Sequence, residues 1–375
     1  MAIETASVRR NDWVGEWPLP ATVLLLAALL LGKDAVAELL HQPAALLALI
    51  ALICAVILAA AIAVVRHAEV LAHRLGEPAG TLLLTLAITG LEVAMVGFVM
   101  STGEEKPTLA RDTMYAVVML VLNGFIGLAL VMGALRHGEQ RYNLLGANAF
   151  LIMIVPLAVL GLVLPDYTKT TPGPILSIFQ MEFLSLMSVG IYGIFLFVQN
   201  QRHRDYFRLD EAGDEADSHE IHESRHPTAF HAAMLGAYGV PLVMLAKQMS
   251  TPLDAMVVQL GAPVALSGLL LALLVLTPEA IAALRAALEN RLQRSINILL
   301  GSVLASIGLT IPSVAVLSML IDLPLELGLR PTETVLLALT LVVSAITLAG
   351  GRSTVLHGAV HLVIFGAFLF LSFVP

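Results

Sequence analysis

Long apolar stretches, separated by short polar segments, run along almost the whole chain. A helix that crosses a bilayer needs about 20 apolar residues, because each residue advances it by only about 1.5 Å. Eleven stretches meet or approach that length, so we predict an all-α integral membrane protein with about eleven transmembrane helices. The predicted spans are residues 19–32, 43–65, 79–101, 112–133, 144–164, 175–199, 228–249, 255–281, 296–321, 332–350 and 353–374.

The composition supports a membrane protein and argues against a soluble one. Among the 375 residues, 58% are hydrophobic and 13% are charged, whereas a soluble globular domain carries about 25% charged residues. The single cysteine, Cys54, lies in an apolar stretch, so no disulfide can form within one chain. The N-terminal segment lacks the apolar run and small-residue cleavage site of a signal peptide, and we expect no cleavage there.

The distribution of basic residues predicts the orientation of the chain in the membrane. With eleven spans, successive loops alternate between the two sides, and one set of loops holds 14 of the 20 Lys and Arg residues. Cytoplasmic loops are enriched in Lys and Arg, so this set is predicted to face the cytoplasm. The N-terminus is then cytoplasmic, and the C-terminus lies on the outer side of the membrane.

Two carboxylates, Glu92 and Glu279, lie inside or at the end of long apolar stretches, one in each half of the chain. A charged side chain at the bilayer centre costs roughly 2.5–3.5 kcal/mol, so such residues usually face a partner, a cavity or an ion path. Their spans are the third and the eighth, an odd number apart, and therefore run in opposite directions. Inverted repeats with a site at the midplane are a recurring plan of transporters. We predict one cation and proton site that is built from both halves.

Polar and helix-breaking residues near the two carboxylates supply further candidates. Gly90 and Pro278 precede Glu92 and Glu279 and predict a break in each helix, which would free backbone carbonyls to bind a cation. The candidate oxygen ligands besides the carboxylates are Thr89, Thr277, Asn123, Ser302 and Ser306. The alternative is that such polar residues only hydrogen-bond between neighbouring helices. His357 and His361, four residues apart in the last span, have the same two interpretations: packing, or a proton path.

The stretches that hold these residues resemble a known family. The matching stretches are Val64 to Val93, Pro107 to Met119, Leu274 to Val314 and Gly351 to Leu362. They are similar to the bacterial ChaA-type sodium-potassium (calcium)/proton antiporters of the cation/calcium exchanger superfamily. The resemblance implies one N-terminal helix and two inverted five-helix repeats, with alternating access. It also implies that Glu92 and Glu279 exchange a metal cation for protons.

The resemblance further implies a domain plan and a location. The implied parts are an N-terminal tail and first helix in residues 1–42, a first repeat in 43–201, a linker in 202–227 and a second repeat in 228–375. The implied location is the bacterial inner membrane, with a periplasmic C-terminus. The implied partners are the lipid bilayer, protons and Ca²⁺, Na⁺ or K⁺, with no cofactor and no nucleic acid; the oligomeric state stays open.

The motif around the first carboxylate leaves the cation open as well. The wider calcium exchangers carry a Gly-Asn-x-x-Glu-like motif, whereas Thr89-Gly90-Leu91-Glu92 lacks its Asn.

The predicted linker is acidic and rich in histidine, with eight acidic residues and four histidines. It is either a solvated tether or a sensor, in which carboxylates collect cations and histidines titrate near pH ~6.5. Its candidate regulatory residues are Asp210, Glu211, Asp214, Glu215, Asp217, His219, Glu220, His222 and Glu223. The segment His222 to His226 also matches H-E-x-x-H, the zinc protease signature, but it lies in a polar linker beside Pro227.

Three functions are compatible with these features. A secondary antiporter that alternates between protons and a cation is the leading hypothesis, and no enzyme activity is expected. A cation channel lined by the two carboxylates is the second hypothesis, and proton coupling separates the two. A membrane metalloprotease depends on the linker motif alone. The sequence contains no nucleotide-binding P-loop, so we do not expect an ATP-driven pump.

Overall fold

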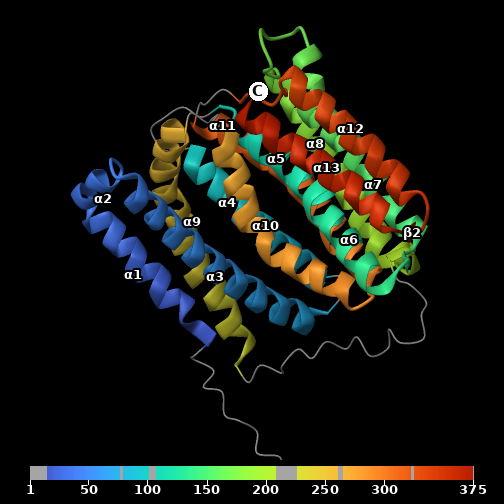
Figure 1. The fold of residues 1–375 in the computed structure, drawn as a ribbon, viewed down its shortest axis with the longest axis horizontal. Helices are drawn as coiled ribbons and strands as arrows, with labels where there is room; N and C mark the ends of the chain where they lie inside the picture. The colour runs from blue at the N-terminus through green and yellow to red at the C-terminus, as the bar shows by residue number, and fades with distance from the viewer. Residues whose placement is uncertain are drawn as a thin grey trace, which may run out of the picture.

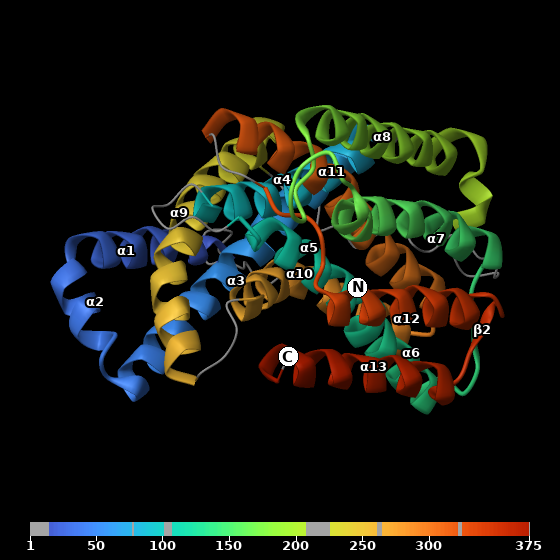
Figure 2. The same cartoon turned by 90° about the horizontal axis from the view of Figure 1, so that it is seen from above.

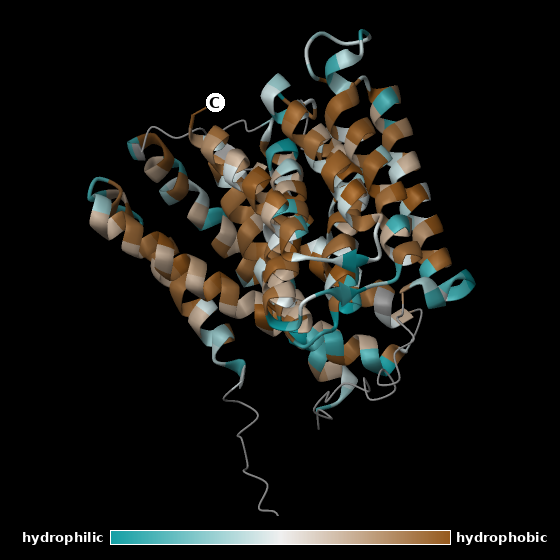
Figure 3. Cartoon of the chain, turned by 45° about the vertical axis from the view of Figure 1, so that its right-hand side comes forward, coloured by the Kyte–Doolittle hydropathy of each residue, from teal (hydrophilic) through white to brown (hydrophobic). Residues whose placement is uncertain are grey.

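The structure, a computed structural model, consists almost entirely of helices. Ten helices among the described residues are long and apolar enough to cross a membrane. Hydrophobic residues dominate along these helices, and hydrophilic residues gather at their ends and in the loops (Figure 3). The prediction of an all-α membrane protein is therefore confirmed. The described residues are 15–76, 79–100, 107–207, 226–260, 265–321 and 325–374.

The first helix is bent. α1 (Pro18–Leu31) and α2 (Lys33–Leu39) meet at Gly32 at an angle of 87° and count together as an eleventh candidate span. α1 has 14 residues and is therefore only about 21 Å long, shorter than the hydrocarbon core of about 30 Å.

Five spans follow in the first half of the chain. The third of them, Leu109–His137, is one continuous helix in which a π-helical turn separates α5 from α6. The elements are α3 (Pro43–Leu75), α4 (Ala79–Met100), α5 (Leu109–Met119), the π-helical turn Leu120–Phe125, α6 (Ile126–His137), α7 (Leu144–Ala158) with its extension to Tyr167, and α8 (Ile178–Phe197) with its extension to Arg202.

Five further spans form the second half. They are α9 (Thr228–Leu260), α10 (Ala265–Leu288), α11 (Leu292–Ile321), α12 (Pro331–Leu348) and α13 (Val355–Phe373). A short antiparallel pair, β1 (Gln140–Arg141) with β2 (Arg352–Ser353), connects the two halves.

The two halves pack against each other with their roles exchanged. Helices α3, α4 and α5 of the first repeat correspond to α9, α10 and α11 of the second. The contact of α4 with α9 corresponds to that of α10 with α3, and the contact of α11 with α4 corresponds to that of α5 with α10. Likewise, α11 packs on α8 as α6 packs on α13. α1, α3 and α9 lie on one side of the molecule, α7, α8, α12 and α13 on the other, and α4 and α10 between them (Figures 1 and 2). The predicted plan of a first helix and two inverted five-helix repeats is confirmed.

The predicted breaks at Gly90 and Pro278 are wrong, because α4 and α10 run through both positions. Beside Pro278, the hydroxyl of Thr277 donates to the carbonyl oxygen of Leu273 at 2.5 Å. In helices that pack within a membrane, hydroxyl groups, water and neighbouring helices can satisfy the backbone groups that a proline frees, so a proline need not break the helix. No carbonyl-lined break is therefore available beside either carboxylate.

The predicted boundary between the seventh and eighth spans is also wrong. α9 continues to Leu260, through Pro241 and Pro252, and α10 begins at Ala265 instead of residue 255. Both prolines lie in a helix that packs against α3, α4 and α10, an environment that tolerates proline.

The two ends of the helix bundle are distinct. α8 ends and α9 begins at one end, which we call the linker end, and α13 finishes at the opposite end (Figure 1). Residues 208–225 lie outside the described residues, so the predicted regulatory linker and most of the H-E-x-x-H match have no structural description here.

Glycine permits the close contact between α13 and α6. A Cβ atom on Gly358 would lie 2.6 Å from the carbonyl oxygen of Gly127 and 2.7 Å from Cγ2 of Val131. The first neighbour is backbone and cannot rotate away, so the two helices must separate if this position carries a side chain. By contrast, a Cβ atom on Gly366 of the same helix would meet no atom within 4 Å.

The Gly358→Ala substitution should therefore destabilise the protein by about 1–3 kcal/mol, the usual range for overpacking. Thermal unfolding in detergent measures the effect, and Gly366→Ala is the matched control that should leave the melting temperature nearly unchanged. Equal melting temperatures for the two variants would contradict the tight α6–α13 contact.

Candidate cation-binding site

A cavity of about 290 Å³ contains both intramembrane carboxylates, Glu92 and Glu279. It lies between α3, α4, α8, α10 and α11. Its lining residues run from the middle of these helices towards the linker end, where Glu69, Gln199 and Asn297 contribute. The chain therefore brings the two halves together around one cavity that both carboxylates line.

Glu92, on α4, is almost completely buried, with 2% of its surface exposed. Its Oε2 atom accepts a hydrogen bond from Oγ of Ser306 at 2.6 Å. Its Oε1 atom is buried and has no hydrogen-bond partner among the described residues. A buried polar atom without a partner costs free energy, so this oxygen is suited to a proton, a cation or a water molecule.

Glu279, on α10, is partly buried and accepts a short hydrogen bond from the hydroxyl of Ser302. Ser302 and Ser306 are four residues apart on α11 and therefore lie on the same face of that helix. α11 packs against both α4 and α10. One helix of the second repeat thus supplies a hydroxyl donor to the carboxylate of each repeat.

Thr89 also lines the cavity, one helical turn before Glu92. The cavity thus collects five of the seven sequence-predicted site residues: Glu92, Glu279, Thr89, Ser302 and Ser306.

The other two predicted ligands lie elsewhere. Asn123, in the π-helical turn, donates to Oγ1 of Thr340 at 2.8 Å and contacts Nδ1 of His361 at 3.2 Å. Nε2 of His361 in turn lies 3.1 Å from Oγ1 of Thr347. These contacts fit the packing interpretation of Asn123 and His361, because they join the first repeat to α12 and α13. Thr277 is used on its own helix, where its hydroxyl donates to Leu273.

His357 has a local role at the start of α13. Its Nδ1 atom lies 3.2 Å from the backbone nitrogen of Thr354, which precedes the helix. The contact is a helix cap, and His357 and His361 therefore serve different contacts despite sharing one face.

Several lining residues were missed by sequence reasoning. Glu69, Gln199 and Asn297 lie in polar segments near helix ends, where charged and amide residues are ordinary and carry no signal. Thr85 could have been found, because it lies seven residues before Glu92 on the same helical face.

The donor chemistry of the cavity suits cations that prefer oxygen. No group of three or more His, Cys, Asp and Glu side chains that could hold a metal ion occurs in the part of the chain that the structure describes. A cation between Glu92 and Glu279 would therefore complete its shell with hydroxyl and water oxygens. Ca²⁺ takes such oxygen ligands.

Apolar packing closes the cavity on the side away from the linker end. Met95, Val96 and Val99, which follow Glu92 on α4, are buried. Gly97 allows Leu317 of α11 to approach, since a Cβ atom on Gly97 would lie 2.7 Å from Cδ2 of that leucine. α4 and α11 are thus in close contact just beyond the carboxylates.

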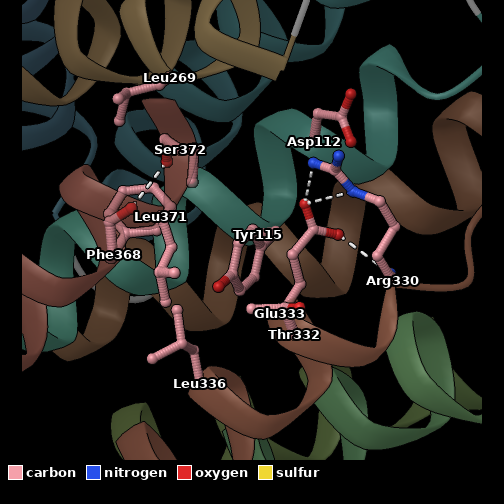
Figure 4. A pocket seen from close by; sticks show the side chains of 11 residues that line it. Asp112, Tyr115, Leu269, Arg330, Thr332, Glu333, Leu336, Phe368, Leu371 and Ser372 are labelled. Carbon is pink, nitrogen blue, oxygen red and sulfur yellow. Dashed lines mark hydrogen bonds and ion pairs between the residues drawn. The ribbon is translucent and has the colours of Figure 1, made fainter. Parts of the chain in front are cut away.

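A smaller pocket of about 60 Å³ lies near the opposite end, between α5, α10, α12 and α13 (Figure 4). Its carboxylates are already paired: Arg330 donates to Glu333 at 2.5 Å, and Asp112 contacts Arg111 at 2.9 Å. Because each negative charge has a guanidinium partner, this pocket is a weaker candidate for holding a cation than the larger cavity.

Comparison with known proteins gives a consistent result. The family model for sodium/calcium exchanger protein matches residues 45–200 and 230–374. The y4hA protein of Sinorhizobium fredii is 48% identical over 84% of this chain and 86% of its own length. The sodium-potassium/proton antiporter ChaA of Escherichia coli is 39% identical, with the same coverage of both chains. The solved structure of the Ca²⁺/H⁺ antiporter YfkE has a TM-score of 0.71 at 16% identity and covers 96% of this chain and 98% of its own.

Labelling of introduced cysteines tests the position of the cavity. In a Cys54→Ser background, Asn297→Cys should react with a membrane-impermeant maleimide, because Asn297 lines the cavity. Ser295→Cys, at a fully buried position on the same helix, should not react. Pro227→Cys, exposed at the linker end, marks the side of the membrane.

Asn297→Cys should react only in vesicles whose orientation also exposes Pro227→Cys. Labelling of Asn297→Cys from the opposite side, or equal labelling of Ser295→Cys, would contradict a cavity open to the linker end.

Proposed function

The chain belongs to the sodium/calcium exchanger protein family, and on that premise we propose that it is a secondary cation/proton antiporter. In this proposal the cavity between α4, α10 and α11 binds a metal cation and protons in turn. The observation that carries the proposal is the arrangement of Glu92 and Glu279 in one cavity, with a buried Oε1 atom of Glu92 that no donor satisfies among the described residues.

Charge compensation supplies the coupling. Two ionised carboxylates in one cavity at membrane depth repel each other and lose hydration, and both effects disfavour the doubly ionised pair. A bound cation compensates the two negative charges, and protons remove them. The two negative charges must be neutralised in one of these two ways before the site can change from facing one side of the membrane to facing the other. Cation transport in one direction therefore requires proton transport in the other.

The side chains around the carboxylates favour binding of a bare or partly hydrated cation. Ser302 and Ser306 each donate to a Glu oxygen, and each hydroxyl oxygen keeps lone pairs that can face a cation. When a Glu is protonated, the same serine can rotate its hydroxyl and accept a hydrogen bond. The two serines can therefore hydrogen-bond to the carboxylates in both the cation-bound and the protonated form of the site without a change of fold.

The accessible side of the cavity defines the conformation. Its lining residues extend to the linker end, and the basic residues predict that this end faces the cytoplasm. We therefore assign the conformation as open to the cytoplasm. The pocket of Figure 4 lies between α5, α10, α12 and α13. The equivalent helices of the other repeat are α11, α4, α7 and α8, and three of these, α4, α8 and α11, line the larger cavity. We assign that pocket as the closed outer access path.

We propose Ca²⁺, Na⁺ or K⁺ as the cation. Two carboxylates with hydroxyl and water oxygens suit Ca²⁺, and the structurally similar YfkE is a Ca²⁺/H⁺ antiporter. ChaA, the more similar in sequence, is a sodium-potassium/proton antiporter. The oxygen ligands accommodate all three ions, and the proposed location is the bacterial inner membrane.

The other two functions receive less support. A channel needs a path open to both sides, whereas the cavity is closed by packing between α4 and α11 at Gly97, and the characterised relatives are antiporters. Those relatives are transporters and not enzymes, so the protease hypothesis has no support beyond the linker motif. A sensing role for residues 210–223 stays a prediction, because they lie outside the described residues.

Neutral substitution of the carboxylates tests the proposal. Glu92→Gln and Glu279→Gln should each abolish cation-dependent proton flux in everted vesicles while the protein still inserts, because Gln keeps the shape but cannot alternate between a charge and a proton. Glu289→Gln, at an exposed position near the end of α10, is the matched control and should exchange normally. Wild-type exchange by either of the first two variants would remove that residue from the mechanism.

A further inference from the structure

A second cluster of titratable side chains lies outside the cation cavity, at the linker end. It joins His67 near the end of α3, His231 near the start of α9 and Glu16 in the turn before α1. Both histidines are buried, with 1% and 4% of their surfaces exposed. These three segments converge at the lower end of the bundle in Figure 1.

The two histidines contact each other directly. Nδ1 of His67 lies 2.8 Å from Nδ1 of His231, and Nε2 of His67 lies 3.2 Å from Oε2 of Glu16. Tyr238 on α9 donates its hydroxyl to the same Oε2 atom at 2.8 Å. The cluster therefore ties α3, α9 and the N-terminal segment together, and an ion pair between Arg66 and Glu16 at 2.5 Å adds to the contact with α3.

Glu16 accepts and does not donate in this cluster. Burial works against its charged form, but the hydrogen bonds from Tyr238 and His67 and the positive charge of Arg66 lower the pKa of this carboxyl below its ordinary value. Glu16 is therefore ionised at neutral pH, and Nε2 of His67 must carry the proton that it shares with the carboxylate.

These contacts limit the number of protons that the histidine pair can hold. A hydrogen bond between the two Nδ1 atoms needs a proton on one nitrogen and a lone pair on the other. Whichever ring holds the bridging proton, the two rings together carry a charge of zero or one. With both rings protonated, two N–H groups would face each other across 2.8 Å, and the pair would have to separate.

The other charged groups around the pair add to this effect. The charged groups that act on His67 are Glu16, Arg66 and His226. His231 faces His67, with Arg74, His226 and Glu16 around it. Apart from Glu16, the charges that these neighbours can carry are positive, so they oppose a second positive charge on the pair.

We propose that His67 and His231 form a proton-binding site, separate from the cation cavity, and that the proton that leaves both rings positively charged opens the junction of α3 and α9 and lowers exchange. The effect on exchange rests on the proposed antiport function, whereas the opening does not. The link to transport is direct: Val65 and Glu69, two residues on either side of His67, line the cation cavity. Acidification at the linker end would thus loosen the helix that forms the cavity wall.

Tryptophan fluorescence measures the opening without requiring transport. The chain has two tryptophans, and Trp13→Phe leaves Trp17, beside Glu16, as the single reporter. We expect the emission of Trp17 in the purified protein to change as the pH is lowered from about 8 to 4. The positive neighbours oppose the second charge, so the transition should lie below the ordinary titration range of histidine, near pH ~6.5. The change should be lost in His67→Asn and His231→Asn and kept in His73→Asn, at an exposed position on the same helix.

Two further arms separate this site from the transport site. The Trp17 transition should persist in Glu92→Gln, even though that variant should not exchange. In vesicles, exchange by the wild-type protein should fall as the pH on the side of the linker end is lowered. This fall, the acid-side decline, should be lost in His231→Asn and kept in His73→Asn. The proposal is overturned if wild-type Trp17 emission shows no transition, or if the transition and the acid-side decline survive in both His67→Asn and His231→Asn.

Discussion

The burial of two carboxylates at membrane depth is the constraint on which the rest of this structure depends. A charged group without water or a partner is costly to bury, and two like charges in one cavity increase that cost. Ser302 and Ser306 offset part of it by donating to the two Glu side chains. They leave the Oε1 atom of Glu92 without a donor among the described residues, so the remaining cost must be met by whatever occupies the cavity.

The fold meets this constraint by dividing the site between two inverted repeats. Each repeat contributes one carboxylate through its second helix, α4 or α10, and α11 holds both in register through hydroxyls one helical turn apart. On one side, polar residues lead from the carboxylates to the linker end. On the other, Gly97 lets α4 and α11 pack closely. A cavity open on one side only is the geometry that alternating access requires, because a path open to both sides would dissipate the gradient.

The lengths of the apolar stretches were enough to predict most of the helices. The odd number of spans between Glu92 and Glu279 was enough to predict the inverted orientation of the two halves and the pairing of the two carboxylates. Local patterns failed where tertiary contacts decide the outcome. Pro278 lies in an unbroken helix that packs against several others, and Asn123 hydrogen-bonds across the repeats instead of lining the cavity. The His67–His231 contact joins residues 164 positions apart, and no local pattern signals it.

Proton release on cation binding tests the central claim most directly. If one pair of carboxylates binds protons and a cation in turn, Ca²⁺, Na⁺ or K⁺ added to the purified protein in weakly buffered detergent solution should release protons. The release should be largest near the pH at which the pair is partly protonated, and it should vanish in the Glu92→Gln/Glu279→Gln double variant. Cation binding by the wild-type protein without proton release, or undiminished release by the double variant, would contradict the account.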